Sequence, residues 1–259
     1  MEEKKVSVDG IETNFKVAGE GPAVLILHGW GSSSDSWVAI QEKIAEKDFF
    51  VICPDLPGFG KTKTPPHPWG VSDYVNWVLE FTETQGLDNF FLLSHSFGGR
   101  VALQLAAQNS QRILGMILCD AAGIKREPGF KTKLVFLAAK VGNVLLAPKV
   151  LTRLKDTARN VFYLFLRNTD YVKADKTMRE TLKKVLEKDI HPFLPKINTK
   201  TLIIWGRRDK MVPLEDAHVL KNEIKNASLK ILPKVDHSPH LQAPDELSRL
   251  AIDFLNDLR

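Results

Sequence analysis

The feature that most constrains the fold of this chain is the stretch 90–103. Residues 90–93 are apolar and strand-like, a turn of small residues follows, and an apolar pattern of helical period begins behind it. Ser96 stands at the apex of the turn. A sharp strand-to-helix turn pushes the hydroxyl of its central serine out of the backbone. We therefore predict that Ser96 is a nucleophile, which requires a base, an acid and an oxyanion site elsewhere in the chain.

Length and composition predict an ordinary soluble globular protein. The chain has 259 residues, 44% of them hydrophobic and 26% charged, enough for one large core or a core with a sub-domain. No apolar run approaches the roughly 18 residues of a membrane span, and the N-terminus lacks the apolar segment of a signal peptide. Cys53 and Cys119 lie in strand-like runs, as expected of buried free thiols in a reducing compartment. The predicted location is cytoplasmic.

The positive charge is concentrated in one segment. Residues 124–196 hold 17 Lys/Arg against 7 Asp/Glu, whereas the rest of the chain holds 19 against 24. The simplest interpretation is a solvated helical surface; the alternative is a surface that attracts anionic lipid or an anionic substrate. The basic residues are not interleaved with exposed-looking aromatic residues and no recognition motif is present, so a nucleic-acid partner is not expected.

Strand-like and helical patterns alternate along most of the chain. A hairpin around Asp9-Gly10 comes first, buried strands follow at 23–27, 49–53, 113–119, 201–205 and 229–232, and helices at 35–46, 71–85, 214–227 and 244–258. This rhythm predicts an α/β fold with an open, mostly parallel sheet and helices on both faces. Residues 124–197 show only helical patterns, at 134–146, 149–166 and 178–188. We predict a core of residues 1–123 and 198–259, with 124–197 inserted as a helical cap.

Candidate partners for Ser96 follow other predicted strands. A serine nucleophile needs a base within hydrogen-bond reach and a third group that orients the base. In an open α/β sheet, such groups gather at the carboxyl ends of the strands. Asp120, Asp209 and His237 each stand just after a strand-like run. His237 is the predicted base, with His240 as the alternative, and Asp209 is the predicted acid, with Asp120 as its rival.

Five motifs together resemble those of a known family. They are His28-Gly29-Trp30-Gly31, the loop 55–60, Ser94-His95-Ser96-Phe97-Gly98-Gly99, Gly206-Arg207-Arg208-Asp209 with Pro213, and the run 236–240 with Pro244. The chain is similar over essentially its whole length to the capped α/β-hydrolases, the group of esterases, carbon–carbon-bond hydrolases and perhydrolases. The resemblance implies the α/β-hydrolase fold, in which the order serine, aspartate, histidine is expected. It also implies that residues 124–197 are the cap over Ser96.

The resemblance assigns further roles around the nucleophile. The spacing between His237 and Pro244 matches the family and favours His237 over His240 as the base. The family places an oxyanion donor on the residue after His-Gly, which is Trp30, with His28 and Gly29 supporting that loop. The second donor is the backbone N–H of Phe97, because the helix that opens there directs free N–H groups toward an oxyanion.

Two positions depart from the family pattern. Ser94 stands where the elbow usually has glycine, and a serine is small enough to allow the tight turn. Asp236 stands where glycine often precedes the histidine, and its carboxylate would raise the pKa of the base if the two side chains met. His95 is expected to be a pocket or packing residue, and Asp55 a turn former.

No cofactor and no metal are predicted. Gly60-Lys61-Thr62 looks like the end of a phosphate-binding loop, but Asp55 occupies the position of the required glycine and prolines follow at 65, 66 and 68. No set of His, Cys and carboxylate residues has the spacing of a metal site. Nucleotide binding is therefore rejected.

The resulting hypothesis is a cofactor-free serine carboxylesterase acting on small to medium esters, with an apolar pocket for the acyl or alcohol group. The alternatives are carbon–carbon hydrolysis of a vinylogous diketone and, in another class, a small-molecule receptor that retains the triad. Dehalogenase and epoxide hydrolase chemistry are disfavoured, since they need an aspartate where Ser96 stands. The expected partner is a small-molecule ester, with no nucleic acid and no stable membrane insertion, and homodimerisation is left open.

Overall fold

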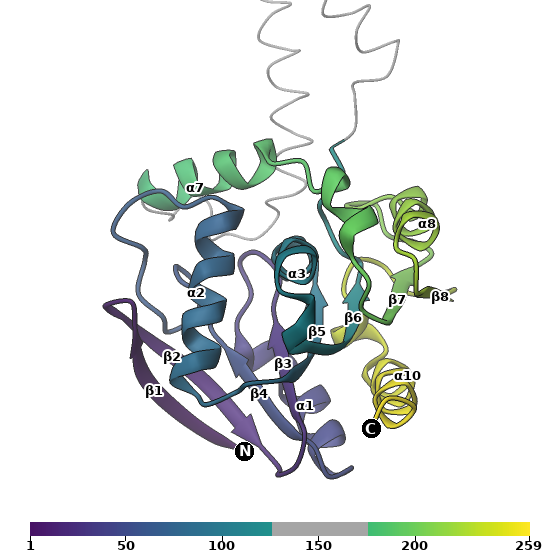
Figure 1. Ribbon diagram of the computed structural model, residues 1–259, viewed down its shortest axis with the longest axis horizontal. Helices are drawn as coiled ribbons and strands as arrows, with labels where there is room; N and C mark the ends of the chain where they lie inside the picture. Colours follow the sequence, from purple (N-terminus) through teal and green to yellow (C-terminus); the bar gives the residue numbers. More distant parts are fainter. Residues whose placement is uncertain (126–175) are drawn as a thin grey trace, which may run out of the picture. The chain divides into compact units, whose positions relative to one another are not determined.

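The fold of this protein is built on a single twisted sheet with helices on both sides. The computed structural model describes residues 1–125 and 176–259, and these residues form an eight-stranded sheet in the order β1-β2-β4-β3-β5-β6-β7-β8 (Figure 1). The strands are β1 (Glu2–Val8), β2 (Ile11–Ala18), β3 (Ala23–Leu27), β4 (Phe50–Pro54), β5 (Phe90–His95), β6 (Ile113–Cys119), β7 (Thr201–Gly206) and β8 (Ala227–Leu232). The predicted α/β class with an open, mostly parallel sheet is confirmed.

The N-terminal hairpin forms the antiparallel edge of the sheet. β1 and β2 pair from Glu2↔Val17 to Val8↔Ile11, and β2 pairs antiparallel with β4. Asp9 (φ 47°) and Gly10 (φ 72°) both adopt left-handed backbone, as a two-residue hairpin turn requires. All remaining neighbours pair in parallel, so the carboxyl ends of β3 to β8 meet along one rim of the sheet.

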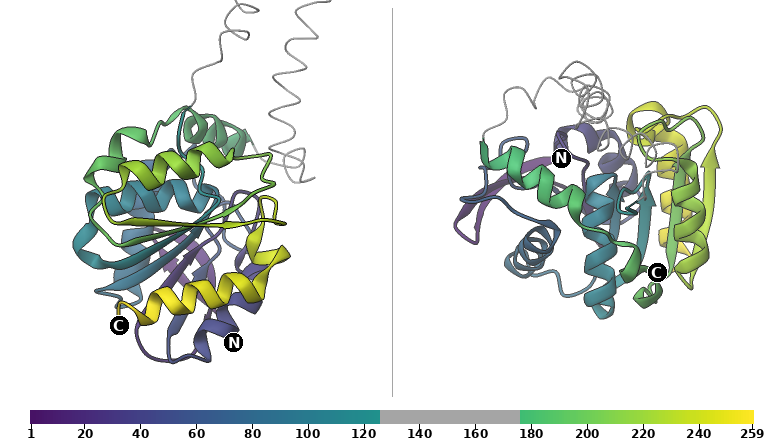
Figure 2. Two further views of the ribbon diagram at one scale, coloured as in Figure 1. Left: turned by 90° about the vertical axis from the view of Figure 1, so that its right-hand side faces the viewer. Right: turned by 90° about the horizontal axis from the view of Figure 1, so that it is seen from above.

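Two hydrophobic cores lie on opposite faces of the sheet. Because side chains alternate along a strand, Leu25 and Leu27 of β3 enter one core and Val24 and Ile26 enter the other. The first core contains residues of α2 (Val71–Thr84), α3 (Phe97–Gln108) and α8 (Leu214–Glu223), and the second contains residues of α1 (Val38–Ala45) and α10 (Pro244–Asn256). Figure 2 shows α8 and α10 on either side of the strands. Burial on both faces explains why the parallel strands are continuous apolar runs.

The helix predicted at residues 35–46 is divided in the structure. A 3-10 turn, η1 (Ser34–Trp37), precedes α1, and Trp37 is fully buried where the two meet. A second short 3-10 turn, η2 (Ser110–Arg112), leads into β6, and the short helix α9 (Pro239–Gln242) precedes α10. The helices predicted at 134–146 and 149–166 lie outside the described residues.

The helix predicted at 178–188 is present as α7 (Lys176–Glu187), and the turn η3 (His191–Lys196) follows it. Residues Met1–Ile124 and Ala174–Arg259 form one compact unit, so α7 belongs to the same unit as the sheet. Its apolar side chains are buried: Met178, Leu182 and Val185. The predicted cap therefore concerns mainly residues outside the described ranges.

Arg100 of α3 fixes the end of α7. Its guanidinium donates to the backbone carbonyls of Val185 (2.7 Å) and Lys188 (2.5 Å). A cation at a helix C-terminus satisfies carbonyls that have no partner within the helix and complements the helix dipole. Burial lowers the pKa of Arg100 to about 10, which still leaves the side chain charged at neutral pH.

Neither described cysteine is paired: Cys53 and Cys119 are buried free thiols, as predicted. Burial raises the pKa of both thiols well above the ordinary value. Within residues 1–125 and 176–259, we find no helix whose length and hydropathy would let it cross a bilayer.

Candidate active site

Ser96 occupies a strained turn between β5 and α3. Its backbone has φ 51° and ψ −111°, a conformation that a non-glycine residue adopts only where its surroundings enforce it. The Ser96 N–H donates to the carbonyl of Cys119 (3.1 Å), and its carbonyl accepts from the N–H of Ala122 (3.0 Å). These bonds to β6 and the segment after it hold the turn. Ser94 does not disturb it, because its buried hydroxyl donates to the Ile117 carbonyl (3.3 Å).

Gly98 and Gly99 let the helix after Ser96 approach the sheet closely. A Cβ on Gly98 would collide with the Leu27 carbonyl oxygen, and a Cβ on Gly99 would lie 2.5 Å from Ala121 Cβ. Both separations are far below van der Waals contact, so a larger residue would force α3 away from β3 and β6. The two glycines are thus part of the construction that positions Ser96.

His237 and Asp209 complete a chain of hydrogen bonds from Ser96. The Ser96 hydroxyl lies 2.9 Å from Nε2 of His237, and Nδ1 of His237 lies 2.7 Å from Oδ2 of Asp209. The carboxylate at Nδ1 favours the tautomer with a proton on Nδ1, which leaves Nε2 free to accept the serine proton. The structure thus brings together the three residues that the sequence analysis selected.

The Asp209 carboxylate is fully enclosed and is held by its own loop. Its side chain is 0% exposed. Its Oδ1 accepts the backbone N–H groups of Met211 (2.7 Å) and Val212 (2.9 Å), which leaves Oδ2 for the imidazole. Three donors around one carboxylate stabilise its ionised form and fix its orientation.

Asp120, the alternative acid, makes no bond to His237 in the structure. Oδ1 of Asp120 accepts the backbone N–H of Gly206 (2.8 Å), and its side chain is fully buried. Burial, followed by the nearby charge of Asp209, raises the pKa of Asp120 to about 8. The geometry therefore favours Asp209 as the partner of His237.

The predicted oxyanion loop lies against the serine. A Cβ on Gly29 would lie 3.4 Å from Ser96 Cβ, so the backbone at Gly29 passes directly beside the nucleophile. The rings of Trp30 and Phe97 meet edge to face with centroids 5.3 Å apart. The Phe97 N–H is the first of α3, where N–H groups have no partner inside the helix. The predicted donor residues, Trp30 and Phe97, are thus in contact with each other, and Gly29 beside Trp30 adjoins Ser96.

His28 holds this loop from beneath. Its Nε2 accepts the backbone N–H of Leu56 (2.9 Å), so Nδ1 carries the proton and donates to the Gly29 carbonyl (2.8 Å). The ring is fully buried, and this burial lowers its pKa. A neutral His28 thus joins the loop after β3 to the loop after β4.

His95 and His240 form a stack of rings behind the base. Nε2–H of His95 donates to the backbone carbonyl of His237 (2.6 Å), and the His95 ring lies 4.6 Å from that of His240. His240 stacks on Trp37, with centroids 4.5 Å apart and an interplanar angle of 3°. Burial lowers the pKa of His95 well below the ordinary value and that of His240 to about 3. His240 is therefore a packing residue, and His95 fixes the backbone of His237, the predicted base.

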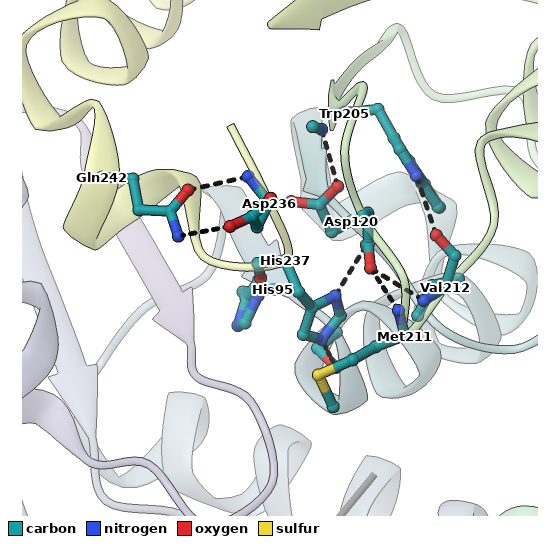
Figure 3. A network of polar contacts seen from close by, with 11 residues as sticks. His95, Asp120, Trp205, Met211, Val212, Asp236, His237 and Gln242 are labelled. Atoms are coloured by element: carbon teal, nitrogen blue, oxygen red, sulfur yellow. Dashed lines mark hydrogen bonds and ion pairs between the residues drawn. The ribbon is translucent and has the colours of Figure 1, made fainter. Parts of the chain in front are cut away.

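Asp236 points away from the base. Its backbone N–H donates to Gln242 Oε1 (2.7 Å) and its Oδ2 faces Gln242 Nε2 (3.4 Å), as Figure 3 shows.

Asp55 proves to be more than a turn former: its carboxylate accepts the N–H groups of Ser34 (2.7 Å) and Lys61 (2.9 Å) and the Asn14 amide (3.1 Å). Asp55 thus connects the segments that contain Asn14, Ser34 and Lys61.

In the described part of the chain, one cluster of side chains offers atoms of the kinds that bind metals. Single atoms of His95, Asp120 and His237 lie within 4.8 Å of one another. However, His237 uses both ring nitrogens, on Ser96 and Asp209, and His95 uses Nε2 on the His237 carbonyl. The hydrogen bonds of the serine site account for this closeness.

Sequence reasoning did not find the roles of Arg100 or of the His95 bond to His237. Both depend on contacts between residues far apart in the chain, and nothing in the local pattern around them indicates a partner. The position of His95 directly before the nucleophile was the one available signal.

The chain was compared with known proteins. Residues 22–244 match a family model described as the alpha/beta hydrolase fold. The monoacylglycerol lipase ABHD6 of Homo sapiens is 25% identical over 257 residues, which cover 92% of this chain and 76% of that protein. An uncharacterized protein of Mycobacterium tuberculosis is 27% identical over 274 residues, covering 96% and 80%.

Solved structures share the fold. A membrane phospholipase A described as a bacterial virulence factor superposes with a TM-score of 0.77 at 24% identity, covering 100% of this chain and 86% of that one. The enol-lactonase of Burkholderia xenovorans LB400 gives 0.76 at 23% identity, covering 98% and 100%. The meta-cleavage product hydrolase CumD of Pseudomonas fluorescens IP01 gives 0.74 at 23% identity, covering 99% and 98%. With a family model matched across most of its length, this chain belongs to the α/β-hydrolase fold family.

Proposed function

We propose that this protein is a serine hydrolase that cleaves small to medium carboxylic esters through an acyl-enzyme on Ser96. The observation that carries the proposal is the continuous relay from Ser96 to His237 (2.9 Å) and from His237 to Asp209 (2.7 Å). Both distances are within hydrogen-bond range, and the carboxylate that orients the base is itself held by two backbone N–H groups. This arrangement is the one that activates a serine hydroxyl.

In the proposed reaction, the Ser96 hydroxyl attacks the ester carbonyl while Nε2 of His237 removes its proton. Asp209 keeps the imidazole in the required tautomer and stabilises the imidazolium that forms. The backbone N–H groups of Trp30 and Phe97 would bind the oxyanion, at the start of a helix whose dipole favours negative charge. The imidazolium then protonates the leaving alcohol. Water, deprotonated by His237, hydrolyses the acyl-enzyme and regenerates the serine.

An ester substrate is favoured over the alternatives by the relatives. ABHD6 is named a monoacylglycerol lipase, and the solved structures of similar fold include a phospholipase and an enol-lactonase. These names refer to ester bonds, although CumD is named a meta-cleavage product hydrolase. The rings of Trp30, Phe59 and Phe97 pack against one another at the start of α3, and such an apolar cluster would suit an acyl group. A cytoplasmic location and a small-molecule partner remain parts of this proposal.

The test is fluorophosphonate labelling followed by hydrolysis of p-nitrophenyl esters of increasing acyl length. Ser96→Ala should lose labelling and should lower kcat on the order of a million-fold, as loss of the nucleophile does in other serine hydrolases. Ser94→Ala is the matched control, because Ser94 lies on β5 two residues before Ser96 and its hydroxyl donates to the Ile117 carbonyl. This variant should be labelled normally.

Retention of esterase activity by Ser96→Ala would refute the nucleophile assignment. A ring-fission product assayed in parallel separates the two enzyme hypotheses, since faster turnover of that compound than of any ester would favour carbon–carbon hydrolysis. Slow single-turnover hydrolysis with a ligand-dependent rise in Tm would favour a receptor instead.

A further inference from the structure

A second buried carboxyl group lies beside the proposed acid of the triad and has no role in the mechanism above. Asp120 follows β6, adopts left-handed backbone (φ 43°) and is fully buried. It holds β7 at two points: its N–H donates to the Ile204 carbonyl (3.1 Å), and its Oδ1 accepts the N–H of Gly206 (2.8 Å). Its Oδ2 is buried and has no donor partner among the described atoms.

The carboxyl group of Asp120 lies close to Asp209: one of its oxygens is within 4.8 Å of a ring nitrogen of His237, and Nδ1 of His237 lies 2.7 Å from Asp209 Oδ2. Both side chains are normally hydrogen-bond acceptors, and after burial the charge of Asp209 is the next largest cause of the raised pKa of Asp120. Two adjacent carboxylates enclosed by protein cannot both be ionised, so the pair retains one proton. The two groups can form a hydrogen bond only when one of them is protonated and donates this proton to the other.

The donors around each group decide which one carries the proton. Asp209 accepts three hydrogen bonds, from Met211, Val212 and His237, and each favours its charged form. Asp120 accepts one, from Gly206. The proton therefore resides on Asp120, because ionisation there would leave a buried charge with a single donor.

We propose that Asp120 is a protonated positioning residue of the triad: its Oδ2–H donates to the Asp209 carboxylate while its Oδ1 anchors Gly206, at the start of the loop that carries Asp209. This inference rests on the proposed function, since it assigns Asp209 as the acid. It replaces the idea that Asp120 is a rival acid with the idea that it supports the acid.

The surroundings of Asp120 agree with a neutral carboxyl group. The titratable groups that approach it are Asp209 after β7, His95 at the end of β5, His237 after β8, and its neighbour Cys119. None of these is a lysine or arginine that would stabilise its anion. Burial and the charge of Asp209 together raise the pKa of Asp120 to about 8.

The first test measures stability and does not depend on catalysis. In the native protein Asp120 keeps a proton that it releases near pH 4 in the unfolded chain. Between about pH 4 and 8, the free energy of unfolding of the wild type should therefore fall as pH rises. Asp120→Asn cannot titrate at this position and should not show this fall. The ratio of the two unfolding constants, from urea titrations, should change about tenfold per pH unit across this window and level off above about pH 8. A ratio independent of pH would overturn the proposal, whether or not the protein hydrolyses esters.

Infrared spectroscopy covers the case in which Asp120→Asn does not fold. In the Ser96→Ala protein with ¹³C-labelled aspartate, the carbonyl stretch of a protonated carboxyl group should be present at pH 7 and disappear on raising the pH well beyond 8. Asp209→Asn removes the neighbouring negative charge and should shift this titration toward lower pH. Absence of the band at pH 7 would show that Asp120 is ionised and would refute the proposal.

The third test separates a positioning role from a catalytic one. Asp120→Asn can still donate to Asp209 and accept from Gly206, whereas Asp120→Ala can do neither. We expect Asp120→Ala to lower kcat about 10- to 100-fold with little change in KM, and Asp120→Asn to recover most of that loss. If Asp120→Asn were as inactive as Asp209→Asn, Asp120 would be the acid itself. If Asp120→Ala matched the wild type, the positioning role would be excluded.

Discussion

At the scale of single residues, the site depends on carboxylates that look alike in the sequence and differ in their surroundings. Asp209 has three hydrogen-bond donors, Asp120 has one, and Asp236 faces Gln242 near the surface. Only the first combination supplies a stable negative charge beside Nδ1 of His237. The same residue type therefore supplies a proposed triad acid, a buried neutral group and a surface contact.

Asp209→Asn should lower kcat on the order of ten-thousand-fold on a p-nitrophenyl ester, with the fold intact by circular dichroism. An amide can donate to Nδ1 of His237 and so favours the tautomer whose Nε2 already carries a proton. Asp236→Asn is the matched control, because Asp236 contacts Gln242 and not the base. It should change stability by no more than about 0.5 kcal/mol and leave the pH profile unaltered. Similar losses in the two variants would contradict the assignment.

At the scale of secondary-structure elements, α3 connects the nucleophile to the rest of the unit. Its N-terminus carries the strained Ser96, and Gly98 and Gly99 press it against β3 and the segment after β6. One turn further, Arg100 binds the carbonyl groups at the end of α7. A displacement of α3 would therefore alter the nucleophile and the anchoring of α7 together.

Arg100→Met should release α7 from α3. The loss of a charged donor to two backbone carbonyls should destabilise the protein by about 1.5–3 kcal/mol, and amide exchange should increase in α7 before it increases in β5. Arg112→Met provides the control, because Arg112 binds the carbonyls of Leu87 (2.7 Å) and Asp88 (3.2 Å) in a different loop. Exchange in α7 that is equal in both variants would show that Arg100 does not anchor this helix.

At the scale of the whole molecule, three buried histidines make stability depend on pH. The pKa values of His28, His95 and His240 are lowered mainly by burial, and that of His240 falls to about 3. Below about pH 6.5 the unfolded chain binds protons at these positions that the native state excludes, so stability falls with decreasing pH. Two groups oppose this trend: Asp120, whose pKa is raised to about 8, and the more exposed His191, whose pKa is raised by its bond to Glu223.

We expect the urea midpoint to decrease between pH 7 and 5, and His240→Phe to decrease less. Phenylalanine keeps the stacking on Trp37 but cannot bind a proton. Below pH 6, the free energy of unfolding of the variant should therefore fall by up to about 1.4 kcal/mol less per pH unit than that of the wild type. The measurement is a series of urea titrations at fixed ionic strength. Parallel curves for the variant and the wild type would mean that His240 titrates normally in the folded state.

The sequence by itself determined the order of the elements and proposed the main site residues. Continuous apolar strands are typical of a parallel sheet whose two faces are both covered by helices. The strand-to-helix elbow requires small residues around an exposed serine. The local patterns at 90–103 and at 236–244 were sufficient to select Ser96 and His237. Boundaries shifted by a few residues, since helix ends are fixed by contacts as well as by propensity.

Tertiary structure alone decided between chemically similar candidates. Asp209 and Asp120 both follow strands. The register of β6 and β7, with the loops that follow them, places Asp209 against Nδ1 of His237 and Asp120 against the N–H of Gly206. The bonds of His95 to the His237 carbonyl and of Arg100 to α7 likewise join residues 142 and 85 or more positions apart. Local sequence determines which side chains lie at the rim of the sheet, because the alternation of side chains along a strand and the conformation of a turn depend on neighbouring residues. Which of them face each other depends on how the strands pair, and no short stretch of sequence contains that information.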